Sequence, residues 1–380
     1  MESIFWILLC VILYTYLGYP LVLCIKSIFR KCSVSTNHME NFHRASVVIA
    51  ARNEGKNIER RIRNIIDQDY PKEKLEVIIV SDGSTDATDD IVRSIIDETK
   101  PFAKNFLRIY SHKPSHGKAF SINTGVAAAT GDIIVFADCR QRFANNAIKE
   151  LVKNFVDQKV GCVSGELVLE KTAGNPIQAE MGVYWRFEKW LRKLESTTGS
   201  VPGATGAIYA IRKKLFQPLP VQTLLDDVLV PMRICMQGYR TIFESKALSY
   251  DMVSRNLDLE KKRKIRTLAG NWQLLVLEPA LLNPLKNPLW IRFMSHKIFR
   301  LLIPYCMILL ILIAFNLLNI YCFLFLTTVA LFFLIALLPP LEGRLTSISK
   351  CTTMFRSIIF LNYFAFLAPL KLVLNRRKLW

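Results

Sequence analysis

The sequence predicts an α/β protein in which a mostly parallel sheet is joined to helical membrane segments. Between residues 45 and 250, short β-branched runs alternate with amphipathic helical stretches. This rhythm is typical of a sheet that carries helices on both faces. Long uncharged apolar stretches lie before and after this block, and stretches of this kind are typical of helices that cross a bilayer.

The composition agrees with a protein of two parts. Hydrophobic residues make up 51% of the 380 residues and the mean hydropathy is +0.25, which is too apolar for a wholly soluble protein. Charged residues still make up 21% of the chain, more than a bundle of membrane helices would carry. The net charge of +19 is spread along the chain without a motif that reads DNA or RNA. We therefore expect an anionic membrane surface as a partner, and no nucleic acid.

The cysteines indicate a reducing compartment. Nine cysteines are scattered along the chain, several of them inside apolar runs, and they form no CxxC pair and no Cys/His cluster. Free, buried thiols are the simplest interpretation.

The first apolar segment is predicted to be a membrane anchor over residues 1–28. Its uncharged core, residues 3–25, is long enough to cross a bilayer. Lys26, Arg30 and Lys31 follow this core. Since positive charge stays on the cytoplasmic side, we expect the amino terminus outside and the following domain in the cytoplasm.

Three further membrane elements are expected after the soluble block. Residues 276–300 mix aromatic and basic side chains, as amphipathic helices at a membrane surface do. The apolar region 301–338 carries Asn316 and Asn319 near its midpoint, which indicates a turn within a transmembrane hairpin. The segment 354–374 has a short apolar core, so an interfacial helix and a third carboxy-terminal span both stay open.

The soluble domain is expected over residues 40–275, and its candidate site lies where its strands end. In parallel α/β sheets, ligands bind beyond the carboxyl ends of the strands. Polar residues follow three of the predicted strands: Asn53 with Glu54, Asp82, and Asp138. These side chains are predicted to form one site.

This domain resembles the cytoplasmic domain of membrane-associated, inverting glycosyltransferases of family two, which have the GT-A fold. The resemblance runs from Val47 to about Gln273 and continues through the membrane segments. Each matching segment is weak alone, and their common order and spacing make the match specific. The segments are "VVIAARNEGKNI", "VSDGSTDAT", "HGKAFSINTGVAAATGD", "FADCRQ", "GATGAIYAIR", "LLDDVLVPMRICMQGYR" and "RKIRTLAGNW".

The resemblance implies three residues that bind the donor nucleotide. Glu54 helps to hold the nucleotide, although a carboxylate there also favours the start of a helix. Asp82 matches the aspartate that accepts a hydrogen bond from uracil, which predicts a UDP-sugar donor. Lys118, beside Gly117, contacts a phosphate at a helix amino terminus. Asp86 is expected to be an ordinary helix cap.

The resemblance also implies a divalent cation, either Mg²⁺ or Mn²⁺. Many GT-A enzymes place Asp-x-Asp at the end of the strand that corresponds to "IIVFAD". Here Asp138 supplies the first acid, and Arg140 occupies the second position. Mg²⁺ often uses one or two carboxylates together with phosphate and water, so Asp138 is predicted to be the metal ligand. Arg140 is expected either to contact phosphate or to pair with a neighbouring carboxylate.

Paired acids precede an apolar helix, where the family has Glu-Asp with the second residue as general base. This chain has Asp226 and Asp227. A neighbouring carboxylate raises the pKa of an acid and makes it a better base. Asp227 is therefore the predicted base, and Asp226 is predicted to cap the helix or to contact the substrate.

The acceptor side is predicted from two segments. "RKIRTLAGNWQ" is similar to the family's Gln-x-x-Arg-Trp element without its glutamine and arginine. This places Trp272 at the acceptor site, and Arg263 and Arg266 either on the donor diphosphate or on lipid. Gly203 opens the segment that is expected to form the acceptor-side loop.

Together these features predict a metal-dependent glycosyltransferase of the bacterial inner membrane with its catalytic domain in the cytoplasm. The resemblance implies transfer from a nucleotide-sugar to a glycan or lipid-linked acceptor, in exopolysaccharide or cell-surface glycan synthesis and with candidate export partners. Two alternatives stay open. One is a polyprenyl-phosphate sugar synthase, against which the Trp272 segment argues. The other is a catalytically silent, nucleotide-binding scaffold of a glycan-export complex, which only Arg140 favours.

Overall fold

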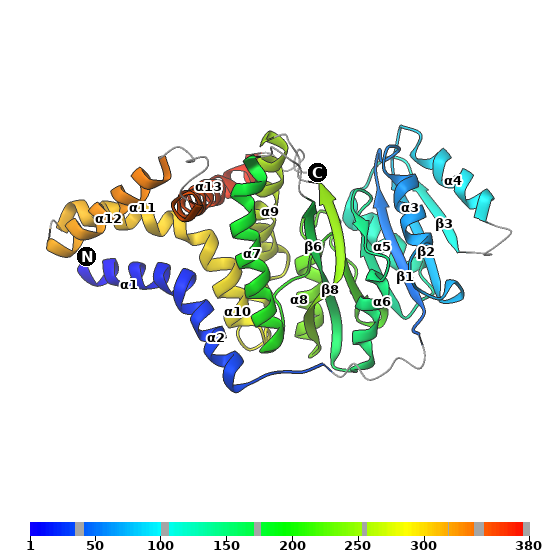
Figure 1. The fold of residues 1–380 in the computed structure, drawn as a ribbon, viewed down its shortest axis with the longest axis horizontal. Helices are drawn as coiled ribbons and strands as arrows, with labels where there is room; N and C mark the ends of the chain where they lie inside the picture. Colours follow the sequence, from blue (N-terminus) through cyan, green and yellow to red (C-terminus); the bar gives the residue numbers. More distant parts are fainter. Residues whose placement is uncertain are drawn as a thin grey trace.

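The structure, a computed structural model, describes residues 1–34, 42–99, 106–170, 176–252, 257–317, 319–337 and 346–374. A mixed sheet with its covering helices forms one end of the molecule, and a group of apolar helices forms the other (Figure 1). Helices α7 (Pro176–Thr197) and α9 (Leu257–Leu277) lie between the two ends.

Within the described part of the chain, the sheet has eight strands in the order β3-β2-β1-β4-β7-β6-β8-β5. The strands β3, β2, β1 and β4 are parallel to their neighbours, as predicted, whereas β7 pairs antiparallel to both β4 and β6. The second half of the sheet is therefore mixed. The strands are β1 (Ala45–Ala51), β2 (Leu75–Asp82), β3 (Leu107–His112), β4 (Ile133–Ala137), β5 (Arg142–Phe143), β6 (Val160–Glu170), β7 (Ile208–Arg212) and β8 (Arg240–Met252).

The strands form because apolar, mostly β-branched residues alternate between two buried faces. In β1, Val47 and Ile49 belong to the core on one side of the sheet, and Val48 belongs to the core on the other. Helix α5 approaches the sheet closely, because a Cβ added at Gly125 would lie 2.4 Å from Cγ1 of Val48. The helices of this half are α3 (Ile58–Ile66), α4 (Thr88–Thr99), α5 (Lys118–Ala128) and α6 (Ala147–Val152).

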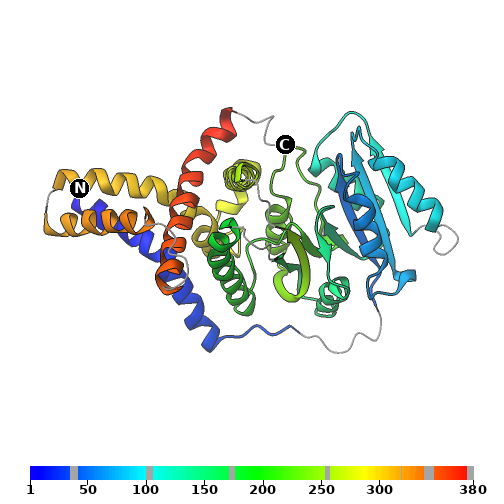
Figure 2. The ribbon, with the colours of Figure 1, turned by 45° about the horizontal axis from the view of Figure 1, so that its top comes forward.

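Among the described residues, four helical stretches are long and apolar enough to cross a membrane, by length and composition: residues 2–29, 290–317, 320–337 and 355–374. They lie together at the end of the molecule away from the sheet (Figure 2). The elements are α1 (Glu2–Leu13), α2 (Tyr19–Phe29), α10 (Trp290–Phe293), α11 (Phe299–Leu317), α12 (Ile320–Leu337) and α13 (Thr346–Leu374).

Two of these stretches contain a π-helical turn. Tyr14–Gly18 joins α1 to α2, and Met294–Ile298 joins α10 to α11. The two turns meet, because the Tyr14 hydroxyl lies 2.9 Å from Oγ of Ser295.

The predicted surface helix over residues 276–300 is not a separate element. Helix α9 ends at Leu277, a short 3₁₀ turn covers Pro279–Leu282, and the next helix begins at Trp290 and continues directly into the apolar α11. The basic and aromatic residues of this segment therefore begin an apolar helix. Three prolines explain the break, because proline ends helices at the residue before it: Pro279 follows the end of α9, and Pro284 and Pro288 precede Trp290.

Candidate functional site

A cavity of about 740 Å³ lies at the carboxyl edge of the parallel strands, bordered by α7 and α9. Nine of the eleven predicted site residues line it, and Gly203 and Trp272 do not. The nine are Glu54, Asp82, Lys118, Asp138, Arg140, Asp226, Asp227, Arg263 and Arg266. The convergence of the strand ends is therefore confirmed by the structure.

Lys118 is the first residue of α5 and lies among the carboxylates. Its Nζ atom is 3.2 Å from Oδ1 of Asp138 and 3.3 Å from Oδ1 of Asp226. Burial lowers the pKa of Lys118, but Asp138, Asp226 and Asp227 together outweigh this effect and raise the pKa above its ordinary value. The cavity therefore holds a permanent positive charge next to its acids.

The prediction that Asp226 caps a helix is wrong. The residue before α8 (Asp226–Met236) is Leu225, and no side chain caps that helix. The buried carboxylate of Asp226 instead accepts a hydrogen bond from the Tyr209 hydroxyl at 3.1 Å and pairs with Lys118. Because the first turn of α8 faces the cavity, Asp226 and Asp227 both line it.

Asp227 has the properties of a base that works near neutral pH. Burial, followed by repulsion from Asp226, raises the pKa of Asp227 from 3.8 to about 6. The charges of Lys118, Lys297 and Arg192 oppose this rise without cancelling it.

The loop before β7 touches Asp227 through a glycine that the sequence analysis missed. A Cβ at Gly206 would lie 2.8 Å from Oδ2 of Asp227, so a larger residue would displace the carboxylate. Gly203 has a φ of +136° and does not line the cavity. Its role is to form the turn, and Gly206 is the residue of this loop that borders the site.

Asp138 follows β4, and its side chain is 38% exposed. No group of three or more His, Cys, Asp or Glu side chains that could hold a metal occurs among the described residues. A single carboxylate that faces a cavity nevertheless fits a Mg²⁺ or Mn²⁺ ion that takes its other ligands from phosphate and water. The residues present therefore fit a cation that binds together with a diphosphate.

Arg140 pairs with a carboxylate, one of its two predicted roles. Its Nε and Nη2 atoms lie 3.1 and 2.5 Å from the two oxygens of Asp251 in β8. Gln141 also donates a hydrogen bond to Asp251, at 3.0 Å. Asp251 lines the cavity and was missed, because no local pattern connects residues 111 positions apart.

Asp82 binds the loop that leads into α5. Its carboxylate accepts hydrogen bonds from Oγ of Ser115 at 2.6 Å and from the backbone N–H groups of His116 at 2.7 Å and Gly117 at 2.8 Å. Burial raises the pKa of Asp82, but these bonds outweigh burial and lower the pKa overall. About one of the four acceptor positions of the carboxylate is left for a ligand.

Asp86 forms a helix cap, as predicted. Its Oδ1 accepts a hydrogen bond from the Thr88 N–H at 3.1 Å, as a helix cap does, and its Oδ2 accepts one from Gly55 N–H at 3.0 Å. Glu54 accepts a hydrogen bond from Nδ2 of Asn57 at 2.8 Å and lines the cavity.

Trp272 does not line the acceptor site. Its ring packs against the hydrophobic core, while Arg263 and Arg266 on the same helix face the cavity. Arg263 also pairs with Glu260 at 2.6 Å. The aromatic residue in the cavity wall is Trp185 of α7, which the sequence analysis did not single out.

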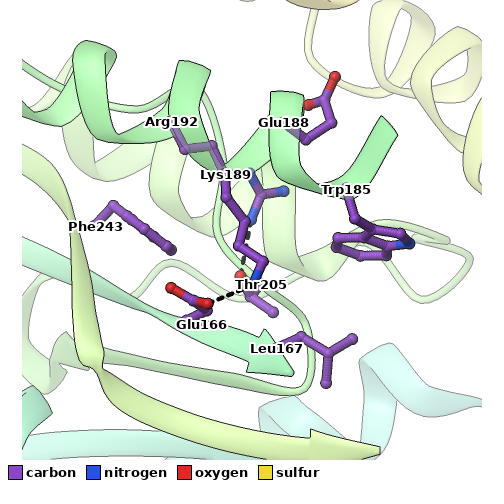
Figure 3. Close-up of a pocket in the computed structure, with 8 residues that line it drawn as sticks. All are labelled: Glu166, Leu167, Trp185, Glu188, Lys189, Arg192, Thr205 and Phe243. Atoms are coloured by element: carbon purple, nitrogen blue, oxygen red, sulfur yellow. Dashed lines mark hydrogen bonds and ion pairs between the residues drawn. The ribbon is translucent and has the colours of Figure 1, made fainter. Parts of the chain in front are cut away.

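The flank of the cavity beside α7 is closed. The space between β6 and α7 measures only about 10 Å³, enough for one water at most (Figure 3). Lys189 pairs with Glu166 at 2.5 Å, and Arg192 donates a hydrogen bond to Oγ1 of Thr205 at 2.8 Å. These contacts hold α7 against the sheet.

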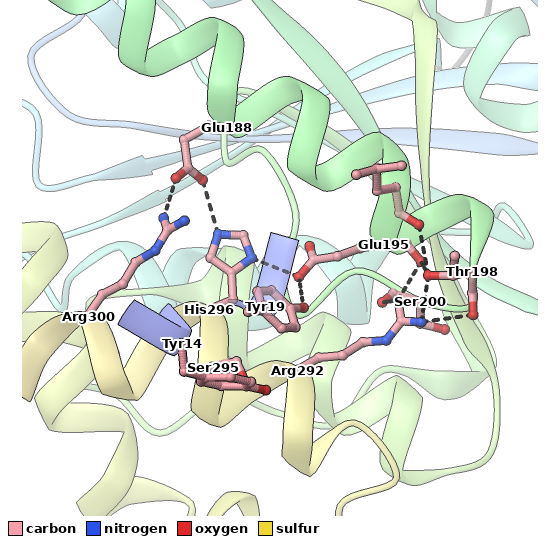
Figure 4. A network of polar contacts seen from close by, with 11 residues as sticks. Tyr14, Tyr19, Glu188, Glu195, Thr198, Ser200, Arg292, Ser295, His296 and Arg300 are labelled. Atoms are coloured by element: carbon pink, nitrogen blue, oxygen red, sulfur yellow. Dashed lines mark hydrogen bonds and ion pairs between the residues drawn. The ribbon is translucent and has the colours of Figure 1, made fainter. Parts of the chain in front are cut away.

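A buried polar network connects α7 to the apolar helices (Figure 4). His296 lies 3.0 Å from an oxygen of Glu188 and 2.9 Å from one of Glu195. Tyr19 donates a hydrogen bond to Glu195 at 2.5 Å, and Arg300 pairs with Glu188. Glu188 also lines the cavity, so the network joins the site to the helices at residues 2–29 and 290–317.

Comparisons with known proteins agree with this geometry. The family model "Glycosyl transferase family group 2" matches residues 133–338, and "Glycosyl transferase family 2" matches residues 46–219. The chain is 25% identical over 252 residues to "Probable glycosyltransferase YdaM" of Bacillus subtilis, which covers 63% of this chain and 58% of that protein. It is 22% identical over 254 residues to the poly-beta-1,6-N-acetyl-D-glucosamine synthase of Staphylococcus aureus, which covers 66% and 59%. The chain thus matches less than two thirds of the length of these relatives.

A solved structure is similar over almost the whole chain. The mannosyltransferase PcManGT from Pyrobaculum calidifontis, in complex with GDP-Man and Mn²⁺, superposes with a TM-score of 0.69 and 23% identity. The match covers 97% of this chain and 99% of that one. This likeness confirms the predicted GT-A type of fold, together with the apolar helices.

Proposed function

The chain belongs to glycosyl transferase family group 2, and from this premise we propose that it is an inverting sugar transferase. It moves a sugar from a nucleoside-diphosphate sugar to a hydroxyl group of a glycan or lipid-linked acceptor. The observation that carries this proposal is the single cavity lined by Asp82, Lys118, Asp138 and Asp227, which come from four separate segments.

The donor occupies the strand-end side of the cavity. Lys118 offers its charge to the diphosphate at the start of α5, and Arg263 and Arg266 face the same space from α9. Asp138 would hold Mg²⁺ or Mn²⁺, which would supply positive charge to offset that of the departing nucleotide. The Mn²⁺ in the complex of the similar mannosyltransferase supports this assignment.

Asp227 is the general base. It takes the proton of the acceptor hydroxyl while the acceptor oxygen forms a bond to the anomeric carbon. The bond from that carbon to the diphosphate breaks, and its electron pair leaves with the nucleoside diphosphate. Attack from the face opposite the leaving group inverts the anomeric configuration. A pKa of about 6 leaves Asp227 mostly ionised at pH 7 while it remains a better base than an ordinary aspartate.

The protein is proposed to be a multi-pass protein of a bacterial inner membrane with its site on the cytoplasmic side. The four apolar helices support membrane insertion. Lys26, Arg30 and Lys31 after the first helix support a cytoplasmic site by the positive-inside rule. The segments 1–28 and 301–338 are then the anchor and the hairpin, and residues 354–374 form a further span.

One observation supports the identity of the donor's nucleotide base, and another supports the identity of the acceptor. The one free acceptor position on Asp82 supports a UDP-sugar, and the matched region of the poly-beta-1,6-N-acetyl-D-glucosamine synthase supports a glycan acceptor. Arg140 is bound to Asp251 and leaves Lys118 and Asp138 facing the cavity, which supports an active enzyme over the silent scaffold.

A donor screen tests the proposed function. The purified chain in lipid nanodiscs is incubated with UDP- and GDP-sugars and Mn²⁺ or Mg²⁺, and release of the nucleoside diphosphate is measured. We expect release from at least one donor that is lost in Asp227→Asn and kept in Asp132→Asn, a change at an exposed aspartate at the opposite end of β4. Nucleotide binding without release from any donor would instead identify a scaffold.

A further inference from the structure

Two cations border the cavity on the side of the apolar helices. Arg192 extends from α7, and Lys297 extends from the helical stretch 290–317. The charges of both reach Asp227, the proposed base. They extend from α7 and from the apolar helices, whereas Lys118 and Asp138 follow the strand ends, so we assign them to the acceptor side of the cavity.

The ammonium group of Lys297 lies near the carboxylates of Glu188, Asp227 and Glu195 without direct contact to any of them. No hydrogen bond or ion pair engages its ammonium group within the part of the chain that the structure describes. Arg192 donates one hydrogen bond, from Nη1 to Thr205, and its side chain points along the pocket flank (Figure 3). Two partly buried cations next to each other repel, and an anion that binds between them removes that cost.

The position of Lys297 is fixed by its neighbours. The adjacent His296 is clamped between Glu188 and Glu195 of α7 (Figure 4). Arg292 donates hydrogen bonds to the backbone oxygens of Ser200 at 2.7 Å and Thr198 at 2.8 Å. The π-helical turn Met294–Ile298 lies in this clamped stretch, and such turns are frequent at functional sites.

The depth of Lys297 indicates a ligand attached to lipid. It lies four residues before Leu301, where the uncharged apolar part of this candidate membrane helix begins. A phosphate group at the end of a lipid chain lies at this boundary between polar and apolar surroundings. Aromatic faces, which hold neutral sugars, are scarce here, because Trp185 is the only aromatic side chain that lines the cavity among the described residues.

We propose that Lys297 and Arg192 form a subsite for the phosphate group of a lipid-borne acceptor. This inference rests on the proposed function for the transfer step, but the subsite binds its ligand whether or not transfer follows. The phosphate either is esterified to a polyprenyl chain as a monophosphate or links such a chain to a sugar as a diphosphate.

Binding measurements test the subsite without turnover. The full-length chain in neutral detergent is titrated with a polyprenyl phosphate, with the polyprenol of the same length, and with a soluble sugar phosphate. We expect the polyprenyl phosphate to bind at least tenfold more tightly than either other ligand, because a charge-assisted hydrogen bond is worth roughly a tenfold to hundredfold change in affinity.

Three variants test whether Lys297 is responsible for the affinity for polyprenyl phosphate. Lys297→Met should lose roughly tenfold or more in affinity for the polyprenyl phosphate, and Lys297→Arg should recover most of it. Lys286→Met, a change at an exposed lysine before the same helix, should bind like the unaltered chain. If Lys297→Met does not fold, Arg192→Gln replaces it in the same assay, with the same expected loss.

The possible outcomes distinguish a failure of the proposed subsite from a failure of the proposed function. Equal binding of polyprenol and polyprenyl phosphate, or full affinity in Lys297→Met, overturns the subsite. Equal binding of the soluble sugar phosphate overturns its assignment to lipid. Absence of nucleotide release from every donor contradicts the proposed function and leaves the binding result standing. Mass analysis of a transfer product then distinguishes a polyprenyl-phosphate sugar from an extended polyprenyl-diphosphate glycan.

Discussion

Replacing Asp227 by asparagine should strongly slow transfer and stabilise the folded chain at neutral pH. The carboxylate that must ionise for catalysis is held where burial and Asp226 oppose its ionisation. Asparagine keeps the size of the protonated acid and cannot take a proton. We therefore expect a loss of roughly 10²- to 10⁴-fold in kcat, the usual contribution of a general base.

The stability effect follows from the two pKa values. The pKa of Asp227 is about 6 in the folded chain and about 3.8 in the unfolded chain, a difference that corresponds to roughly 3 kcal/mol. Because the folded pKa is the higher one, this residue lowers the free energy of unfolding progressively between pH 3.8 and 6. Partial exposure to solvent reduces the effect, so Asp227→Asn should gain roughly 1–3 kcal/mol above pH 6 and nothing below pH 4.

Two measurements check this reasoning. The pH profile of kcat/KM for the unaltered chain should rise with a slope of one and level off above about pH 6. Thermal unfolding in detergent should show a higher Tm for Asp227→Asn at pH 7.5 than for the unaltered chain, and equal Tm values at pH 4. Asp132→Asn should change neither quantity. A pH profile that is flat from pH 5 to 8, or a Tm for Asp227→Asn that is not raised at pH 7.5, would refute the argument.

Three further predictions concern the loop, the core and the metal. Gly206→Ala should lower kcat at least tenfold with an unchanged Tm, because the new Cβ would lie 2.8 Å from Oδ2 of Asp227. An unaltered kcat would show that Gly206 does not lie this close to the carboxylate of Asp227. Gly125→Ala should lower the free energy of unfolding by roughly 1–3 kcal/mol, because its Cβ would overlap Val48, and an unchanged Tm would show that α5 lies further from the sheet. Chelation by EDTA should stop nucleotide release until Mn²⁺ or Mg²⁺ is restored, and Asp138→Asn should need more metal for half-maximal rate; EDTA-resistant release would exclude the metal.

The residues that converge at the strand ends could be predicted because a parallel sheet brings its carboxyl ends to one edge. Asp82 ends one run of buried apolar residues and Asp138 follows another, and the parallel pairing of β1 with β2 and β4 places these two runs on either side of β1. Local pattern and topology together were enough for these positions.

Contacts that depend on helix rotation or on distant pairing were not predictable in this way. Trp272 lies six residues after Arg266, and a helix turns by about 600° over six residues, which places the indole about 240° from the arginine. The tryptophan therefore faces the core. Asp251 pairs with Arg140 through the mixed half of the sheet, whose strand order no local pattern reveals.

The two π-helical turns that meet at Tyr14 and Ser295 constrain how these helices can vary in length. Each such turn adds one residue, which offsets the faces of the helix before and after it by about 100°. One half of each helix is thereby oriented toward its apolar neighbours and the other half toward α7. Losing a single residue from either turn would leave a regular, equally apolar helix with one half misdirected, so these helices should tolerate many substitutions but hardly any deletion.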